Sequence, residues 1–227
     1  MSLILNIDTA IDTAYISIAK NGIILEQASN TDQKDHGAFL QPAIKLIAKK
    51  AGILLNELDA IAVVSGPGSY TGLRVGMASA KGLCYALKKP LITLTSLKLL
   101  AYQVIKENGE NIKDFNPLFC PMIDARRMEV YTIIYNKVLN IELSPCSMII
   151  NENSFANFLL KNNIYFFGNG ASKCESFITN KNAHFIKNIY NSLYMSILAN
   201  EEFINKQFSD LAYTEPFYIK EFYNSIN

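Results

Sequence analysis

The stretch LILNIDTAIDTAYISIA, residues 3–19, contains the pattern that decides the fold. Its first apolar run ends at Asp8, a short polar turn follows, and a second apolar run begins at Ala14. Two such runs separated by turn residues predict a pair of strands. Asn21-Gly22 is a strong signal for a further hairpin turn, and it predicts a third strand over residues 23–26.

The same outline returns in the second half of the chain. Residues 118–123 predict a strand that ends at Asp124, and a tight turn leads into a second strand over 129–135. A duplicated unit of strand, aspartate, turn and strand is the outline of the two-lobed α/β fold of actin, sugar kinases and the Hsp70 ATPase, the ASKHA fold. We therefore expect a first lobe, 1–107, and a reduced second lobe, 108–227, with the C-terminal tail free to return to the first.

Each half also contains a buried strand that ends in a glycine-rich loop. In the first half the apolar residues 60–64 lead into the loop SGPGSYTG at 65–72 and a long helix to about residue 87. In the second half residues 164–167 lead into GNGA at 168–171 and a further helix. A continuous apolar strand suits the centre of a sheet that is covered on both faces.

The composition excludes several classes of protein. Half of the 227 residues are hydrophobic and 18% are charged, which excludes a disordered chain. The apolar runs are far shorter than the roughly 20 residues that cross a bilayer, and the N-terminus has no basic segment of a signal peptide, so we expect a cytoplasmic protein with reduced cysteines. The net charge is +1, without the basic excess that strong tRNA binding by the chain alone needs.

The two turns that follow the aspartates lack the glycines of a phosphate clamp. They read TAIDT at 9–13 and ARRM at 125–128, whereas close approach to phosphate oxygens favours glycine. We therefore interpret Asp8 and Asp124 as caps of the turn backbone, and we expect no cofactor on the isolated chain. Arg126 and Arg127 are either solvated turn residues or contacts for an anion or an acidic partner.

The loop at 65–72 does not match a phosphate-binding loop. It lacks the spacing GxxxxGK[ST], and Pro67 removes one of the N–H donors that such a loop uses. The N-terminus of the following helix is still a candidate anion contact, through Ser69, Thr71 and Arg74.

Small residues recur at every fourth position of this helix. The residues that share this face are Gly68, Gly72, Gly76, Ala80 and Cys84, and Ala78 and Gly82 form a second row. Each glycine inside a helix costs about 1 kcal/mol relative to alanine, a cost that close approach by another backbone offsets. Two interpretations stay open: the first row packs on the chain's own sheet, or it forms an intermolecular helix–helix interface.

A catalytic metal site or nucleophile is not expected. The chain has two histidines, His36 and His184, and Leu40 stands four residues after His36, where a metal-binding pair on a helix needs a second histidine. No GxSxG nucleophile motif occurs. We therefore expect no catalytic and no metal-binding residues.

Several segments together resemble one family, TsaB, also called YeaZ. They are ILNIDTA at 4–10, HGAFLQPAI at 36–44, SGPGSYTGLRVGMASAKGL at 65–83, DARRMEVY at 124–131, GNGA at 168–171 and EPFYIKEF at 215–222. The resemblance spans nearly the whole chain, and GPGSYTGLRVG is its most specific segment. It implies a two-lobed actin-like fold related to that of the larger enzyme TsaD.

The resemblance also implies a role as a subunit. TsaB-like proteins act in making threonylcarbamoyladenosine next to the tRNA anticodon, where TsaD transfers the threonylcarbamoyl group and TsaE is a further ATPase component. This implies a non-catalytic chain that pairs with a TsaD-like protein and a TsaE-like ATPase, forms a homodimer when alone, and meets ATP or ADP only in the assembled complex. A glycoprotease-like hydrolase and a small actin-like kinase are the alternatives.

The family resemblance assigns a pairing surface to two helices, which match residues 36–51 and 69–87 here. In the catalytic relative two histidines four residues apart bind the metal, and Leu40 in the second position prevents that role from carrying over. The implied contacts with a partner are His36, Leu40, Ile44, Gly72, Leu73, Val75, Gly76, Ser79 and Ala80.

Overall fold

The chain folds into two compact units in a computed structural model that describes residues 1–32 and 36–220. The first unit contains Met1–Leu99 and Tyr190–Phe217, and the second contains Leu100–Ile189 with the described part of Tyr218–Asn227. Relative to the expected ranges 1–107 and 108–227, the first unit ends earlier and takes back a C-terminal portion of the chain. It does so because a C-terminal helix hydrogen-bonds to its sheet.

The first unit is built on a five-stranded sheet of order β3-β2-β1-β4-β5. Its strands are β1 (Leu3–Asp8), β2 (Ala14–Lys20), β3 (Ile23–Asn30), β4 (Ala60–Gly66) and β5 (Leu91–Thr95). The hairpins predicted from the first stretch of sequence are confirmed, since β1, β2 and β3 pair antiparallel in sequence order. The buried strand β4 pairs in parallel with β1 and β5, so it is an interior strand of the sheet, as its continuous apolar sequence predicts.

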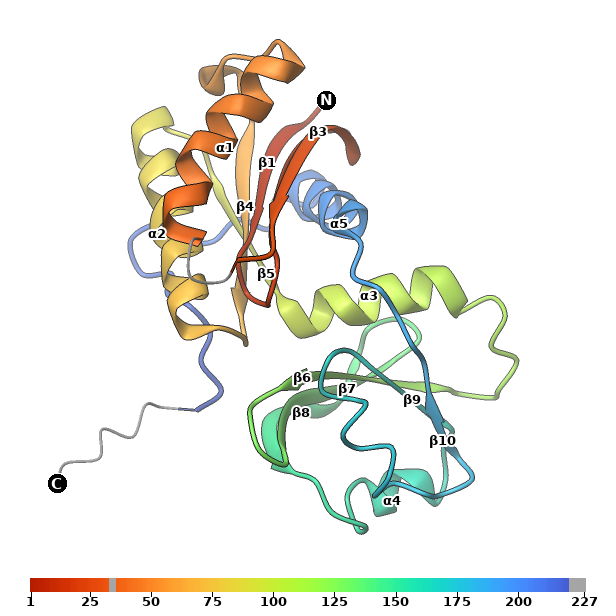
Figure 1. Cartoon of the computed structure of the whole chain (residues 1–227). Helices are drawn as coiled ribbons and strands as arrows, with labels where there is room; N and C mark the ends of the chain where they lie inside the picture. The colour runs from red at the N-terminus through yellow and green to blue at the C-terminus, as the bar shows by residue number, and fades with distance from the viewer. Residues whose placement is uncertain (33–35, 221–227) are drawn as a thin grey trace, which may run out of the picture. The chain divides into compact units, whose positions relative to one another are not determined.

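Helices cover both faces of this sheet (Figure 1). The helices α1 (His36–Ala51) and α2 (Tyr70–Leu87) pack on one face. On this face Leu5 and Ile7 of β1 pack in one hydrophobic core with apolar side chains of both helices. The helix α5 (Ser192–Ile204) lies on the other face, where the Nδ2 of Asn6 donates to the Oγ of Ser196 at 3.1 Å. Alternate residues of β1 thus point to opposite layers, as the pleat of a strand requires.

The second unit repeats the strand order of the first. Its sheet has the order β10-β9-β6-β7-β8, so the first strand again lies between an antiparallel hairpin partner and a parallel strand. The strands are β6 (Leu118–Asp124), β7 (Glu129–Asn136), β8 (Ile141–Ile149), β9 (Ile164–Phe167) and β10 (Ala183–Phe185). The duplication inferred from the sequence, and with it the α/β ASKHA-like fold, is confirmed.

The connections of the second unit are shorter than those of the first. One crossover contains only the four-residue helix α4 (Ala156–Leu159). The helix predicted after residues 168–171 is wrong, because residues 171–177 form successive turns in which Cys174 N donates to Ala171 O and Phe177 N donates to Cys174 O. The second lobe is therefore reduced in its helices, while its sheet keeps all five strands.

Two further elements complete the described chain. The helix α3 (Ser96–Asn108) crosses the boundary between the units, and the short 3-10 helix η2 (Leu55–Glu57) precedes β4. Within the described residues, the structure has no helix of the length and apolar character needed to cross a bilayer.

Candidate functional site

The two strand-end aspartates close their turns in the same way. Asp8 Oδ1 accepts a hydrogen bond from the backbone N–H of Ala10 at 2.9 Å, and Asp124 Oδ1 accepts one from the N–H of Arg126 at 2.6 Å. In each turn the carboxylate binds the amide two residues further on, a local pattern typical of aspartate. The interpretation of both residues as caps of the turn backbone is confirmed.

Asp8 is buried within its own unit, next to a tyrosine. Only 2% of its surface is exposed, and the buried hydroxyl of Tyr190 lies beside its carboxylate. Burial, followed by the nearby Asp8 carboxylate, raises the pKa of Tyr190 well above its ordinary value. The rings of Tyr190 and Tyr15 pack with their centroids 5.0 Å apart. Asp8 thus faces a neutral phenol at physiological pH.

The second turn carries an exposed pair of arginines. Arg126 and Arg127 have φ values of 70° and 50°, and the ammonium group of Lys173 holds the turn by donating to Asp124 Oδ1 at 2.7 Å and to Arg127 O at 2.9 Å. Partial burial raises the pKa of Asp124. The hydrogen bonds from Lys173 and from the N–H of Arg126 lower this pKa by more than burial raises it, so the net shift is downward. The exposure of both arginine side chains agrees with a solvated turn and with an anion contact alike.

The first small-residue row of α2 packs inside the chain. A Cβ atom on Gly72 would overlap the carbonyl oxygen of Thr9, one on Gly68 would overlap that of Ala10, and one on Gly76 would overlap the Thr9 hydroxyl. Two hydrogen bonds fasten the same contact: Thr9 Oγ1 donates to Gly72 O at 2.7 Å, and Ser69 N donates to Ala10 O at 2.7 Å. The row therefore holds the turn after β1 against α2, and the intermolecular interpretation of this row is wrong.

Most of the expected partner contacts are core residues for the same reason. The members that are buried within the chain are Leu40, Ile44, Gly72, Leu73, Gly76 and Ala80. A side chain without exposed surface cannot contact another protein unless the unit opens, so these six are corrected to core positions. Val75 and Ser79 are half-buried on α2 and stay accessible. His36 is the first residue of α1, and its side chain lies outside the described residues.

The opposite face of α2 is exposed and carries little charge. Its exposed residues are Thr71, Arg74, Ala78, Gly82, Tyr85 and Ala86. Nothing lies within 4 Å of the position that a Cβ atom on Gly82 would take. In the sequence, the second row of small residues, Ala78 and Gly82, marks this exposed face. The first row is longer, so it was the stronger candidate for an interface.

The three candidate anion contacts have defined positions at the start of α2. Ser69 is the N-cap, and its hydroxyl oxygen accepts a hydrogen bond from the N–H of Gly72 at 3.3 Å. The guanidinium of Arg74 lies over the ring of Tyr70, 3.9 Å from its centroid, and Thr71 is exposed between them in sequence. The serine hydroxyl is thus engaged by the helix itself, which leaves Thr71 and Arg74 as the accessible pair of the three.

Comparison with known proteins agrees with this architecture. A family model described as "TsaD: tRNA N6-adenosine threonylcarbamoyltransferase" matches residues 11–214. The chain belongs to the TsaB (YeaZ) family. A "tRNA threonylcarbamoyladenosine biosynthesis protein TsaB" of Haemophilus influenzae is 28% identical over 96% of this chain and 93% of its own length. The protein of that name in Bacillus subtilis is 34% identical, over 58% of this chain and only 54% of its own length.

Solved structures show the same fold. "YeaZ from Pseudomonas aeruginosa" superposes with a TM-score of 0.77 at 22% identity and covers 96% of this chain and 100% of that chain. A polyphosphate/ATP-glucomannokinase from Arthrobacter superposes with a TM-score of 0.51 at 9% identity, over 90% of this chain and 100% of that chain. This TsaB-family chain therefore shares the architecture of actin-like kinases.

Groups that would hold a metal do not come together in the described part of this TsaB-family chain. Among these residues, no three side chains of histidine, cysteine, aspartate or glutamate lie together in a group that could hold a metal ion. His184 stacks on Tyr165 and its Nε2 lies 3.2 Å from Asn163 Oδ1. Cys84, Cys120, Cys146 and Cys174 are free thiols.

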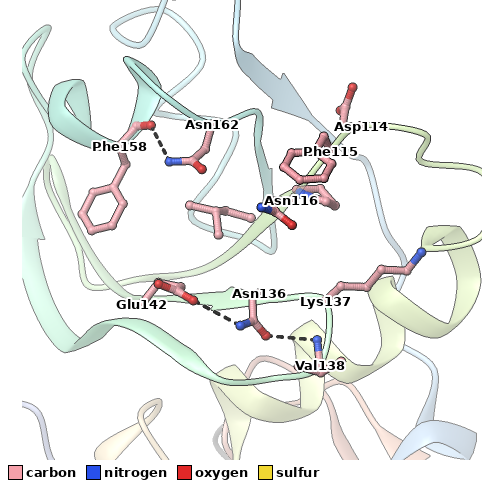
Figure 2. Close-up of a pocket in the computed structure, with 11 residues that line it drawn as sticks. Asp114, Phe115, Asn116, Asn136, Lys137, Val138, Glu142, Phe158 and Asn162 are labelled. Carbon is pink, nitrogen blue, oxygen red and sulfur yellow. Dashed lines mark hydrogen bonds between the residues drawn. The ribbon is translucent and has the colours of Figure 1, made fainter.

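The second unit contains a pocket of about 580 Å³, shown in Figure 2. Its lining residues are Asp114, Phe115, Asn116, Pro117, Leu118, Asn136, Lys137, Val138, Glu142, Phe158 and Asn162. Asn136 hydrogen-bonds to Glu142 and to the N–H of Val138, and Asn162 donates to Phe158 O, so these amides support the local backbone. The lining contains no serine, cysteine or histidine side chain.

Proposed function

We propose that this chain is a non-catalytic subunit in the biosynthesis of threonylcarbamoyladenosine in tRNA, and that it pairs with a TsaD-like protein and works with a TsaE-like ATPase. The observation that carries the pathway is the alignment over 96% of the chain with a protein named for this biosynthesis. The match of residues 11–214 to the TsaD model supports a partner of related fold.

Two buried positions support a non-catalytic role. Leu40 is fully buried in the apolar core, at the position where the resemblance places the second metal-binding histidine of the catalytic relative. Asp8 caps its own turn and faces the phenol of Tyr190, which leaves little of its carboxylate for a metal or a phosphate. On this proposal ATP or ADP is bound only in the assembled complex.

The exposed face of α2 supports the pairing. A helix face that remains in water normally carries charged residues, whereas α2 contains only Arg74 and Lys81 as charged residues. The ammonium of Lys81 donates to two backbone carbonyls of the same unit. Interface centres are depleted in charge and enriched in tyrosine, as this face is with Ala78, Gly82 and Tyr85. We assign the same face to homodimer formation when the partner is absent.

An arginine at the centre of this face tests the pairing. Ala78→Arg should abolish co-purification with the TsaD-like protein from the same genome, because a long charged side chain would hold the partner away from the helix. Ala156→Arg is the matched control, since Ala156 is an exposed alanine on α4 in the other unit. Co-elution of Ala78→Arg at the wild-type stoichiometry would show that the partner docks elsewhere.

The pathway needs a separate experiment. Depletion of this protein in its host should lower threonylcarbamoyladenosine in hydrolysed tRNA, and the wild-type gene should restore it. Nucleoside mass spectrometry measures the modification directly. An unchanged level after depletion would show that the chain acts in another process.

A further inference from the structure

The C-terminal end of the first unit is fastened across α2 and the edge of the sheet. Residues 209–217, here called the strap, begin with Ser209, whose N–H donates to Leu91 O at 2.8 Å and whose hydroxyl lies 2.7 Å from that of Thr93. They end with Phe217, whose N–H donates to Ser65 O at 2.7 Å. The strap is therefore an ordered segment that passes α2 between two strand ends (Figure 1).

Hydrogen bonds fix the backbone of the strap on both sides of one tyrosine, Tyr213. Asp210 Oδ1 accepts hydrogen bonds from the N–H groups of Ala212 at 2.8 Å and Tyr213 at 3.1 Å. The ammonium of Lys81 donates to the carbonyls of Ala212 at 3.2 Å and Thr214 at 2.8 Å, on either side of Tyr213. The side chain of Tyr213 is nevertheless 85% exposed. An aromatic ring on a fixed backbone loses little conformational freedom on binding, which favours affinity.

This tyrosine adjoins the charge-poor face of α2. Lys81, which grips the strap, is followed by Gly82 on the exposed face and by Tyr85 one helical turn later. Tyr85 is itself 81% exposed. Lys81 thus joins the backbone on both sides of Tyr213 to the helix that carries Tyr85, so each of the two connected segments presents an exposed aromatic ring. Tyrosine is one of the residue types that most often dominate the binding energy of a protein interface.

We propose that Tyr213 of the strap is an anchor residue for the protein that docks on the exposed face of α2. The inference rests on the proposed function and commits to the TsaD-like protein as the occupant. We choose this occupant because the strap is continuous with the exposed face of α2: Lys81 of that helix fixes the backbone on both sides of Tyr213. The surface for the partner is therefore formed by two segments that are far apart in sequence, α2 and the strap.

Isothermal titration of the full chain with the TsaD-like protein tests the anchor. Tyr213→Ala should raise Kd by about 30-fold or more, the range of interface anchors, without lowering the melting temperature, because the ring is exposed. Tyr213→Phe keeps the ring and should stay within about 3-fold of wild type. Phe115→Ala is the matched control, because Phe115 is a 92% exposed aromatic in the other unit; it should bind as wild type.

A second variant tests the role of the fixed backbone. Lys81→Met keeps the apolar stem but removes the donor to both strap carbonyls, and it should raise Kd by about 3- to 10-fold through the cost of ordering Tyr213 on binding. Added to Tyr213→Ala it should have almost no further effect on Kd, since the ring that it positions is gone. Full additivity of the two losses would contradict the positioning role of Lys81.

The outcomes separate this inference from the function on which it rests. Wild-type affinity of Tyr213→Ala, together with lost binding by Ala78→Arg, would overturn the anchor and leave the pairing intact. Wild-type affinity of both variants would overturn the pairing surface as well. A loss confined to self-association, seen by sedimentation of the chain alone, would show that the occupant is a second copy and would overturn the choice of partner.

Discussion

Replacing Gly72 by alanine tests the internal packing of α2. The new Cβ would lie 3.2 Å from the carbonyl carbon of Thr9 and well inside 3.0 Å of its oxygen, a separation that Cβ atoms essentially never show. The obstacle is backbone, and Thr9 is fully buried, so α2 and the turn after β1 must separate. Gly72→Ala should therefore destabilise the unit.

The magnitude follows from two opposing effects. Overpacking of a close-packed contact costs about 3 kcal/mol at the upper end of its usual range, while alanine gains at most about 1 kcal/mol of helix propensity over glycine. The net loss is about 2 kcal/mol, or about 4–8 °C of melting temperature for a chain of this size. Gly82→Ala is the control in the same helix, because nothing lies within 4 Å of its Cβ position. It should raise the melting temperature by about 1–4 °C.

Calorimetry of the two variants beside the wild type measures both shifts. Opposite signs for Gly72 and Gly82 are the expected result. A melting temperature of Gly72→Ala at or above that of the wild type would refute the internal packing, because it would mean that the helix and the turn are not in contact. The folded fraction of Gly72→Ala should still bind the partner, since Gly72 is not on the exposed face.

Two further predictions concern the titratable groups. Iodoacetamide at mildly alkaline pH should modify Cys146 first, because its side chain is only half-buried, although burial raises its pKa as well. Cys84 and Cys174 are buried, and burial raises the pKa of each to about 11. Reaction of all thiols at one rate, measured by peptide mass spectrometry, would contradict this prediction. Burial, followed by the hydrogen bond to Asp114 at 2.5 Å, raises the pKa of Tyr165 to about 12. A raised pKa stabilises the fold below the unfolded value of about 10 and loses that contribution as the pH rises to about 12, so the stability difference between wild type and Tyr165→Phe should shrink over this window in denaturant titrations; a constant difference would contradict it.

The duplicated architecture was predictable from the sequence because its determinants are local. In each unit the sequence pattern of an apolar run, an aspartate and a turn predicts the first two strands, and the aspartate accepts a hydrogen bond from an amide only two residues away. Such contacts depend on neighbours in the chain. The helix predicted after residues 168–171 is not formed: residues 171–177 are turns, because tertiary context outweighs a weak local preference.

What the sequence by itself determined is which residues share a face. A period of four put Gly68, which precedes α2, in one row with Gly72 and Gly76 of that helix, and it put Ala78 and Gly82 in another row. Only the tertiary structure decided which row faces inward, because the answer depends on Thr9, which is distant in sequence and occupies the space beside Gly72. Periodicity shows which residues share one face of a helix. Long-range packing decides which of these faces turns toward the sheet and which toward a partner.

The same reason explains the residues that the sequence did not reveal. Tyr190 lies beside the Asp8 carboxylate, and Lys81 donates to the carbonyls on both sides of Tyr213, although more than a hundred residues separate the partners in each case. No local pattern marks either contact. Each arises because the chain leaves the first unit, builds the second, and returns with α5 and the strap to the sheet on which it began.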